Sequence, residues 1–518
     1  MKLYCAVFEK VLPEYCATLT YMACIQFIST LTVFWFWPTL TDVGISMSEQ
    51  EKQGVDESRR QLLKIGAGTI AGVGAVAGAG SWIKHKVEGV EQDGYPVEIS
   101  PELKPKDQRD VLLTFACSPA LAAKHPERNL SFSLDSEGPI KPGEKAFNFQ
   151  QHCQNFLTAP ERADNSKVGY TQLDYALEEA CWEGMNRMAP MQAFGFPNQG
   201  MFGWDQSDVA HQQYPFEDSV EMISSIKTAA KTFGAVRVGI CRPDKRWNYD
   251  PLYDAIQEKT LSWEEDFPFE PKSVIVMLTD MDYEAMACAP MIPASATAAM
   301  GYSHNTLQAG AMAKFMRRLG YPAVGSGNDL GNSVAYAISA GLGEGARNGQ
   351  IIAPGLGPRV RISKVYTSLE LDDAAYDKPR DFGILSFCEN CKRCAESCPG
   401  KAISMDDKPS MGSTLPGHDD PDYNWQGQPG IRKFHNDAKK CFKFWSDNGG
   451  DCGACISSCP WNKPDFWHHR LIDGSNTFTG GAVHSMMKQA DILFGYGNVN
   501  DEKAVKKFWR SGFSGDFT

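Results

Sequence analysis

Apolar and polar positions follow helical and strand periods through the middle of the chain, over roughly residues 216–380. Asp218 is a good N-cap for the first helical run, which stops at Gly234. Other stretches are short, apolar and of the length of buried strands. Helices and strands that alternate in this way favour a layered α/β domain. The predicted helices cover 218–233, 305–319 and 333–340, and the predicted strands cover 236–241, 273–279 and 360–367.

The regions on either side lack long periodic runs. Residues 81–215 are rich in proline, glycine and polar residues, which predicts an irregular N-terminal segment wrapped on the core, with one helix over 170–188. Residues 381–465 contain half of the 16 cysteines and form a further region, which is followed by a C-terminal segment over 466–518.

Composition narrows the class of protein. A chain of 518 residues is long enough for about three domains, and 42% hydrophobic residues argue against disorder. The 51 basic and 63 acidic residues give a net charge of -12. A domain that binds nucleic acid is usually basic, so that class is disfavoured.

Residues 47–80 resemble a twin-arginine export signal. Arg59 and Arg60 are followed by a weakly apolar stretch rich in glycine and alanine, with Leu62 where the signal usually has phenylalanine. Ala77-Gly78-Ala79 is a suitable cleavage site. An ordinary surface helix is the alternative, but the many glycines disfavour it. Because this pathway exports folded proteins, it suits a chain that receives its cofactors in the cytoplasm.

Residues 1–46 precede this signal, although an export signal normally begins a chain. Residues 21–37 form a mostly apolar run near the lower length limit for a membrane span. Met47 opens a polar lead-in of ordinary length, and our hypothesis is that translation begins there and that residues 1–46 are a mis-annotated extension. A true membrane anchor is the alternative, and N-terminal analysis of the precursor distinguishes the two.

Eight cysteines between Cys388 and Cys459 carry the strongest chemical signal in the sequence. They form two motifs, and each ends in C-x2-C-x3-C-P. In such runs the tight loop presents its cysteines to one cubane cluster, and the last cysteine ligates the other cluster. One [4Fe-4S] cluster is therefore predicted at Cys388, Cys391, Cys394 and Cys459, and a second at Cys398, Cys441, Cys452 and Cys455.

Zinc sites and disulfide frameworks also bring cysteines together in sequence, but neither fits this pattern as well. Zinc sites use C-x2-C pairs, but not two interlocked runs that end in Cys-Pro. Disulfide frameworks are typical of short secreted domains. Outside the motifs, single cysteines are scattered along the chain and are predicted to be buried thiols: Cys117, Cys153, Cys181, Cys241 and Cys288.

The middle domain contains neither a G-x-G-x-x-G motif after a strand nor a P-loop, so a dinucleotide or nucleotide site is not supported. Three stretches place polar residues among apolar neighbours, over 300–305, 325–329 and 357–362. An insertion over 405–437 contains Trp425 and Phe434, and for both a pocket wall and the core are open alternatives.

These features together resemble the respiratory corrinoid-dependent reductive dehalogenases. The resemblance covers nearly all of residues 58–518 and is strongest over 270–400 and 440–465. It rests on the export signal, the two cysteine motifs, and the stretches Gly341-Leu342-Gly343-Glu344, Arg347-Asn348-Gly349 and Lys378-Pro379.

The resemblance implies an α+β or layered α/β fold class. A nitroreductase-like, corrinoid-binding core is expected over 216–380, with a ferredoxin-like domain that holds two [4Fe-4S] clusters over 381–465. It also implies a base-off corrinoid of the cobalamin type between the substrate pocket and the nearer cluster. The D-x-H-x-x-G motif of other corrinoid enzymes is absent here, as it is in that family, so no histidine ligand to cobalt is expected.

The resemblance places the family's catalytic tyrosine at Tyr302, its partner asparagine at Asn328 and its basic residue at Arg361. Reductive removal of halide needs two electrons and one proton. A tyrosine, whose ordinary pKa is about 10, can donate that proton. Arginine stays charged, and an asparagine can hydrogen bond to the phenol oxygen or to the leaving halide.

Two neighbouring residues compete for these roles. Strand alternation puts Arg359 on the same side as Arg361, so both can line the site. His304 lies close to Tyr302, but a surface or structural histidine is the simpler interpretation.

The expected function is reductive dehalogenation, R–X + 2e⁻ + H⁺ → R–H + X⁻, as the terminal reductase of organohalide respiration. The family implies a small membrane anchor protein, a respiratory electron donor, and a peripheral location on the outer face of the cytoplasmic membrane. The organohalide stays open.

Two alternatives come from other classes. An epoxyqueuosine reductase-like enzyme acts on tRNA in the cytoplasm, and the export signal and acidic balance oppose it. A non-catalytic iron–sulfur electron-transfer module leaves most of the chain without a role, and cobalt content separates it from both enzymes.

Overall fold

The computed structural model describes residues 89–190, 194–464 and 481–511. Contacts within the chain separate Met1–Gly80 from Ser81–Thr518, and every described residue belongs to the second unit. The predicted export signal over 47–80 and the upstream extension over 1–46 lie outside the described residues. In the three described ranges, no helix is both long and apolar enough to cross a bilayer.

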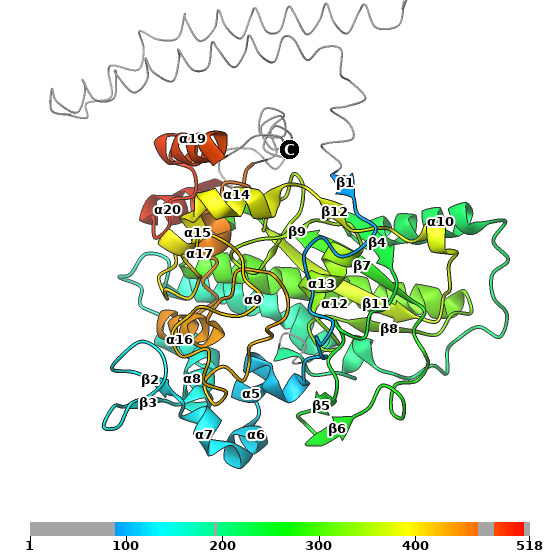
Figure 1. The fold of residues 1–518 in the computed structure, drawn as a ribbon, viewed down its shortest axis with the longest axis horizontal. Helices are drawn as coiled ribbons and strands as arrows, with labels where there is room; N and C mark the ends of the chain where they lie inside the picture. Colours follow the sequence, from blue (N-terminus) through cyan, green and yellow to red (C-terminus); the bar gives the residue numbers. More distant parts are fainter. Residues whose placement is uncertain (1–88, 191–193, 465–480, 512–518) are drawn as a thin grey trace, which may run out of the picture. The chain divides into compact units, whose positions relative to one another are not determined.

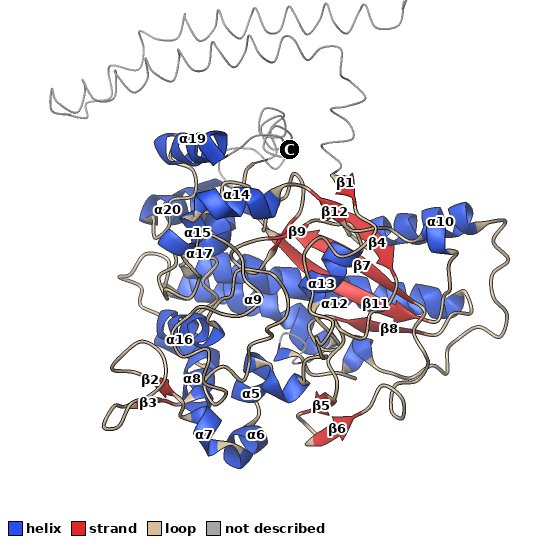
Figure 2. Cartoon of the chain, in the orientation of Figure 1, coloured by secondary structure: helices blue, strands red, loops and turns tan. Residues whose placement is uncertain are grey.

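A four-stranded antiparallel sheet is the central feature of this unit (Figure 2). Strands β7 (Ser273–Asp280) and β11 (Val360–Thr367) pair along their whole length, with Val360 opposite Asp280 and Thr367 opposite Ser273. Three strands lie where the apolar runs predict them. The fourth was not predicted, because its four residues are too few and too small to form an apolar run. The strand order is β4 (Arg237–Cys241), β7 (Ser273–Asp280), β11 (Val360–Thr367) and β8 (Ala323–Ser326).

Helices cover both faces of the sheet, which confirms the predicted layered arrangement. Alternate residues of β7 point to opposite faces. On one face Val274, Val276 and Leu278 pack with α13 (Ser333–Ser339). On the other face Ile275 and Met277 pack with α10 (Ser219–Thr232) and α12 (Ile292–Arg318).

Helix α12 is the longest described helix, and it begins at Ile292 rather than at residue 305 as predicted. Its first turns consist of alanine, serine and threonine, and residues 292–299 are all buried. A helix buried on every side has no polar face, so the period that signals an amphipathic helix is missing there. The correction places Tyr302 inside the helix.

The N-terminal segment is more helical than predicted. Its longest helix is α9 (Gln172–Met188), which matches the helix predicted over 170–188 and begins with a capping box of Thr171 and Asp174. Four shorter helices precede it: α5 (Leu112–Ala116), α6 (Pro119–Lys124), α7 (Pro126–Asn129) and α8 (Phe149–Leu157).

The helices that carry the motif cysteines gather to one side of the central sheet (Figure 1). They are α14 (Ile384–Cys391), α15 (Arg393–Glu396), α16 (Ala438–Asn448) and α17 (Ala454–Ser457), and α19 (Gly481–Leu493) and α20 (Glu502–Arg510) follow them in the chain.

The remaining elements are short. Helix α11 (Tyr283–Met286) precedes α12, and single 3-10 turns occur at Gln108–Asp110, Ala159–Arg162, Gly200–Phe202 and Asp373–Ala375. Two-stranded pairs join β1 (Val90–Glu91) to β12 (Arg380–Asp381), β2 (Phe132–Ser133) to β3 (Ala146–Phe147), β5 (Leu252–Asp254) to β6 (Lys259–Leu261), and β9 (Glu344–Gly345) to β10 (Ile351–Ile352).

Candidate active site

Tyr302, Asn328 and Arg361 lie together on the wall of a cavity of about 700 Å³. The Nδ2 group of Asn328 donates a hydrogen bond to the phenol oxygen of Tyr302 over 3.1 Å. The guanidinium carbon of Arg361 lies 4.6 Å from the centre of the Tyr302 ring. The structure thus brings the three predicted residues into direct contact.

Each of the three side chains comes from a different element. Tyr302 lies in α12, Arg361 in β11, and Asn328 in the turn after β8. This turn is held by Asp329, whose Oδ1 accepts hydrogen bonds from the Ser326 hydroxyl at 2.7 Å and the Gly327 amide at 2.8 Å. The position of Asn328 is therefore fixed by its own loop.

Gly301 allows β11 and α12 to approach closely beside Tyr302. A Cβ atom at this position would lie 2.6 Å from Cγ of Arg361, which is too close for any real contact. The glycine that precedes the tyrosine therefore makes room for the arginine that lies over the tyrosine ring.

Two further residues complete the surroundings of the trio, and neither was predicted. The Trp182 ring stacks on Tyr302, with centroids 5.4 Å apart and planes 17° apart. Asp451 Oδ2 lies 3.8 Å from Nη2 of Arg361. Burial raises the pKa of Asp451 to about 6, and Arg361 opposes that shift. The one available signal for Asp451 was its position directly before Cys452.

The two competing residues lie elsewhere. Arg359 donates from Nε to Oδ1 of Asn462 over 3.1 Å and from Nη1 to the carbonyl of Met281, and it is not among the described residues that line the cavity. The expectation that Arg359 and Arg361 both line the site is therefore wrong, because Arg359 precedes β11 and binds backbone there. His304 is exposed on α12, as its simpler interpretation predicts.

The eight motif cysteines gather in two adjacent groups, and none forms a disulfide. Burial, together with the neighbouring thiols, raises the pKa of Cys388, Cys452 and Cys455 to about 12. Cys394 interacts with Cys455 of the other group, so the groups are neighbours. The interacting thiols are Cys388, Cys391, Cys394 and Cys459 in the first group and Cys398, Cys441, Cys452 and Cys455 in the second.

This arrangement suits the binding of iron–sulfur clusters. A buried thiol does not ionise unless a cation compensates the charge, and cluster iron is such a cation. No three His, Cys, Asp or Glu side chains of the described residues are arranged to ligate a single metal ion. A cubane cluster holds its four thiolates farther apart than the ligands of one ion.

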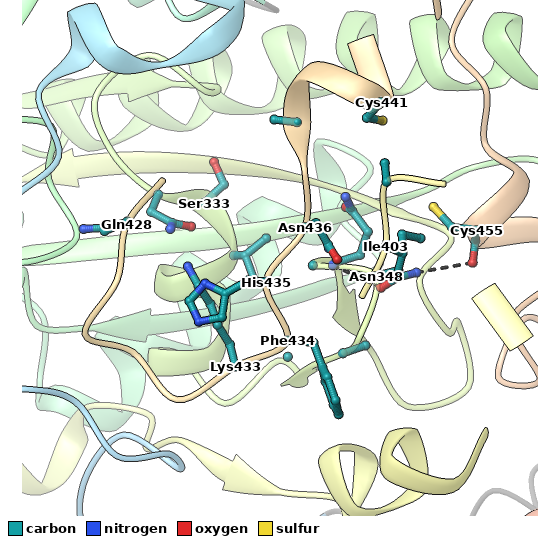
Figure 3. Close-up of a pocket in the computed structure, with 18 of the residues that line it drawn as sticks. Ser333, Asn348, Ile403, Gln428, Lys433, Phe434, His435, Asn436, Cys441 and Cys455 are labelled. Carbon is teal, nitrogen blue, oxygen red and sulfur yellow. Dashed lines mark hydrogen bonds between the residues drawn. The ribbon is translucent and has the colours of Figure 1, made fainter. Parts of the chain in front are cut away.

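The second cysteine group shares the cavity with the trio. All four of its cysteines line the cavity wall, together with Tyr302, Asn328 and Arg361. Figure 3 shows Cys455 beside Asn348, and Cys441 farther up in the same view. The thiols of the second group thus border the same space as the phenol group of Tyr302.

One turn of the core holds both cysteine motifs. Arg347 is fully buried and donates from Nε and Nη2 to the carbonyl of Cys388, over 3.1 and 2.9 Å. Nδ2 of Asn348 donates to the carbonyl of Cys455 over 3.3 Å (Figure 3). Glu344 accepts hydrogen bonds from the amides of the residues that begin α14. The core and the cysteine region are thereby joined at defined points.

The cavity wall fits a corrinoid in chemistry. Its volume lies in the upper part of the usual range of roughly 300–1,000 Å³ for ligand sites. The wall combines hydroxyl, amide and ammonium groups at Ser333, Gln428 and Lys433 with apolar groups at Ile403 and Phe434 (Figure 3). A corrinoid presents a broad macrocycle bordered by amide side chains, which need such hydrogen-bonding partners.

Comparison with known proteins agrees with these observations. Residues 387–463 match a family model described as a 4Fe-4S dicluster domain. A tetrachloroethene reductive dehalogenase of Desulfitobacterium hafniense is 33% identical over 446 residues, which covers 75% of this chain and 78% of the relative. A tetrachloroethene reductive dehalogenase of Sulfurospirillum multivorans is 34% identical over 307 residues, 54% of this chain and 58% of the relative.

Solved structures show the same fold. The catabolic reductive dehalogenase NpRdhA superposes with a TM-score of 0.58 at 22% identity, over 82% of this chain, which spans about half (51%) of the solved chain. An epoxyqueuosine reductase of Lactococcus garvieae is 25% identical over 198 residues and covers only 34% of this chain. The fold class expected from the resemblance is confirmed, and the chain belongs to the reductive dehalogenase family of oxidoreductases.

Proposed function

We propose that this chain is a corrinoid- and iron–sulfur-dependent enzyme that replaces the halogen of an organohalide with hydrogen, R–X + 2e⁻ + H⁺ → R–H + X⁻. The observation that carries the proposal is the single cavity shared by the trio and the second cysteine group. A proton donor and an electron carrier on one wall are the two requirements of this reaction.

The two cysteine groups are the proposed sites of two [4Fe-4S] clusters. Electrons enter at the first group and leave from the second, because the second group borders the cavity. The corrinoid lies in the cavity, where Ser333, Asn348, Gln428 and Lys433 would hold it. When bound in base-off form, it supplies electrons to the carbon–halogen bond.

Tyr302 is the proposed proton donor. Its oxygen accepts the hydrogen bond of Asn328, and a phenol oxygen that accepts one hydrogen bond keeps its own O–H group as a donor. After proton transfer, the same Asn328 donor and the Arg361 charge stabilise the phenolate that remains. The negative charge thus forms where a hydrogen-bond donor and a cation are already in place.

A second proposed role of Arg361 is to bind the leaving halide ion. Its Nε is buried and has no hydrogen-bond partner among the described residues. A buried donor without a partner is costly. A halide ion in the adjacent cavity would remove that cost.

The substrate, the location and the partners are further parts of the proposal. Relatives that match long stretches of the chain are named for tetrachloroethene, so a small chlorinated alkene is the first substrate to test, beside a brominated compound and a halophenol. We propose that the chain is exported by the twin-arginine route and serves organohalide respiration on the outer face of the cytoplasmic membrane. There a small anchor protein holds it, and a respiratory donor reduces it.

Metal analysis of the anaerobically purified protein tests the cofactors, with corrinoid supplied to the expression host. We expect about eight irons per chain for two cubane clusters, one cobalt, and halide release that the Tyr302→Phe variant loses. Eight irons without cobalt, in a folded protein that releases no halide, would contradict the proposed function and would indicate a non-catalytic electron-transfer module.

A further inference from the structure

A half-buried ammonium group that has no counter-ion among the described residues lines the cavity. Lys433 belongs to a segment whose backbone is paired with Ser410 through two hydrogen bonds of 3.0 and 3.1 Å, so its position is fixed. Its side chain lies on the cavity wall (Figure 3). Among the described residues, no side chain or carbonyl group forms a hydrogen bond or ion pair with its ammonium group. Burial lowers the pKa of Lys433 to about 8.

A second ammonium group lies nearby and increases the positive potential. Lys106 also lines the cavity, and its charge lowers the pKa of Lys433 further. Nζ of Lys106 donates to the carbonyls of Trp425 at 2.6 Å and Gly427 at 3.0 Å. Burial lowers the pKa of Lys106 to about 8, against the effect of Asp110 and Asp107. Two like charges at a partly buried site are costly unless an anion lies between them.

The carboxylate of Asp437 already interacts with other groups of the protein. Asp437 accepts hydrogen bonds from the Tyr423 hydroxyl at 2.6 Å and from the amides of Lys439 and Lys440, and it lies 3.5 Å from His418. His435 uses Nε2 for the Ser410 carbonyl at 3.0 Å. In the part of the chain that the structure describes, no carboxylate pairs with Lys433, so a ligand in the cavity can supply the anion.

We propose that Lys433, assisted by Lys106, binds a phosphodiester, namely the one that links the nucleotide loop to the corrin ring of a complete corrinoid. A phosphodiester carries one negative charge and strong acceptor oxygens, which match one or two ammonium donors. This inference rests on the proposed corrinoid dependence. It extends that proposal by assigning the end of the cavity at Lys433 and Gln428 to the nucleotide loop.

The test compares two corrinoids that share a ring but differ in the phosphodiester. Corrinoid-free full-length protein with its clusters is titrated with cobalamin and with cobinamide, which lacks the phosphate and the nucleotide, and binding is followed by corrin absorbance. Lys433→Met should weaken cobalamin binding on the order of 10- to 100-fold, the effect of one lost charged hydrogen bond. Its effect on cobinamide should be less than about 3-fold, because that ligand has no phosphate for Lys433 to hold.

Two variants serve as controls. Lys433→Arg keeps the charge and should keep the preference for cobalamin. Lys104→Met removes an exposed lysine of the same segment as Lys106, outside the cavity, and should bind both corrinoids like the wild type. Iron content and circular dichroism show that each variant is folded, and Lys433→Gln replaces the methionine variant if that one does not fold.

Three outcomes overturn the proposal. An equal loss for both corrinoids in Lys433→Met would mean that the lysine contacts the ring, and no loss would mean that it holds nothing. If inorganic phosphate stabilises the corrinoid-free wild type but not Lys433→Met, while cobalamin binding is unchanged, the site takes free phosphate. If the wild-type protein binds neither corrinoid, the proposed function itself is refuted. This result is distinguishable from the three outcomes above.

Discussion

The side-chain amide of Asn328 donates a hydrogen bond to the phenol oxygen of Tyr302 over 3.1 Å. This contact crosses from the turn after β8 to the middle of α12, so it depends on the packing of the helix on the sheet. Because the oxygen is the acceptor, the hydroxyl hydrogen of Tyr302 is directed away from Asn328. The position of Tyr302 on the cavity wall, with its hydroxyl group as a donor, is the basis of the first prediction.

Replacement of Tyr302 by phenylalanine removes the proton donor and keeps the ring that Trp182 and Arg361 contact. We expect turnover to fall by a factor of about 10² to 10⁴, the usual worth of a positioned general acid. Iron content, corrinoid content and thermal stability should stay at wild-type values. Steady-state halide release checks the prediction, and a variant with wild-type turnover would show that the proton comes from another group.

Gly301→Ala is expected to reduce activity without touching any cavity residue other than Arg361. The added Cβ would lie 2.6 Å from Cγ of Arg361, so the arginine must leave its place over Tyr302. Displacement by about 1 Å can cost on the order of 100-fold in rate. The measurement is kcat at saturating substrate.

Gly310→Ala is the matched control on the same helix. Its added Cβ would meet the side chain of Met201, so the substitution affects the stability of α12 but not the trio. Equal losses of kcat in the two variants would attribute both to helix packing and would contradict the role of Gly301.

The last cysteine of each motif belongs to the group formed by the other motif. This exchange predicts which cysteine variants have the same paramagnetic resonance spectrum. Cys398 belongs to the first motif in sequence but to the second group in space, beside Cys455. Cys398→Ser and Cys455→Ser should therefore alter the same cluster signal in electron paramagnetic resonance. Cys459→Ser and Cys391→Ser should alter the other signal.

Cys241→Ser serves as the control, since this buried cysteine lies outside both groups. It should keep both signals and about eight irons. A spectrum in which Cys398→Ser resembles Cys391→Ser would mean that each motif builds its own cluster.

Glu178 predicts that the folded protein loses stability as the pH rises. Burial raises the pKa of Glu178 from 4.5 to about 8, although the Ser295 hydroxyl hydrogen bonds to it. Between these two values the folded state holds a proton that the unfolded state has lost. The free energy of unfolding therefore decreases as pH rises from about 5 to about 8, on the order of a few kcal/mol.

The Glu178→Gln variant should lack the contribution of Glu178 to the pH dependence of the free energy of unfolding, because an amide does not titrate. The variant should match the wild type near pH 5 and exceed its stability at pH 8, as measured by anaerobic urea unfolding. Asp329 and Glu344, whose pKa values burial raises to about 6 and about 7, contribute equally to both proteins. Identical pH slopes would show that Glu178 is ionised in the folded state.

Local signals in the sequence predicted the elements that form locally. Helix α10 has its cap at Asp218 and its stop at Gly234, and β11 fits its predicted bounds. The first half of α12 has no such signal, because it is buried on all sides. The cysteine groups follow from tight local loops, so spacing alone indicated them.

The trio could not be derived from spacing, and only the family resemblance pointed to it. Tyr302, Asn328 and Arg361 meet because β11 lies beside β8 under α12, and strand order is not visible in a single sequence. The sequence also did not indicate whether Phe434 and Trp425 lie on the cavity wall or in the core. Phe434 lines the cavity, whereas Trp425 packs in the core 4.8 Å from the ring of Phe115.

One expectation about the single cysteines was wrong, because Cys117 is only half-buried and is not isolated. Cys117 and Cys153 are 36 residues apart in the sequence, yet their sulfur atoms lie 2.8 Å apart, between α5 and α8. Packing of the N-terminal helices causes this pairing, and those helices are short and were largely missed.

The exchange of Cys398 and Cys459 between the two groups has a consequence for biosynthesis. A nascent chain that has emerged only as far as α14 and α15 cannot complete either cysteine group. The first group still lacks Cys459, and the second still lacks Cys441, Cys452 and Cys455. Neither cluster can then be inserted during translation of the first motif. The second cluster can be completed only after residue 455 has been translated, and the first only after residue 459.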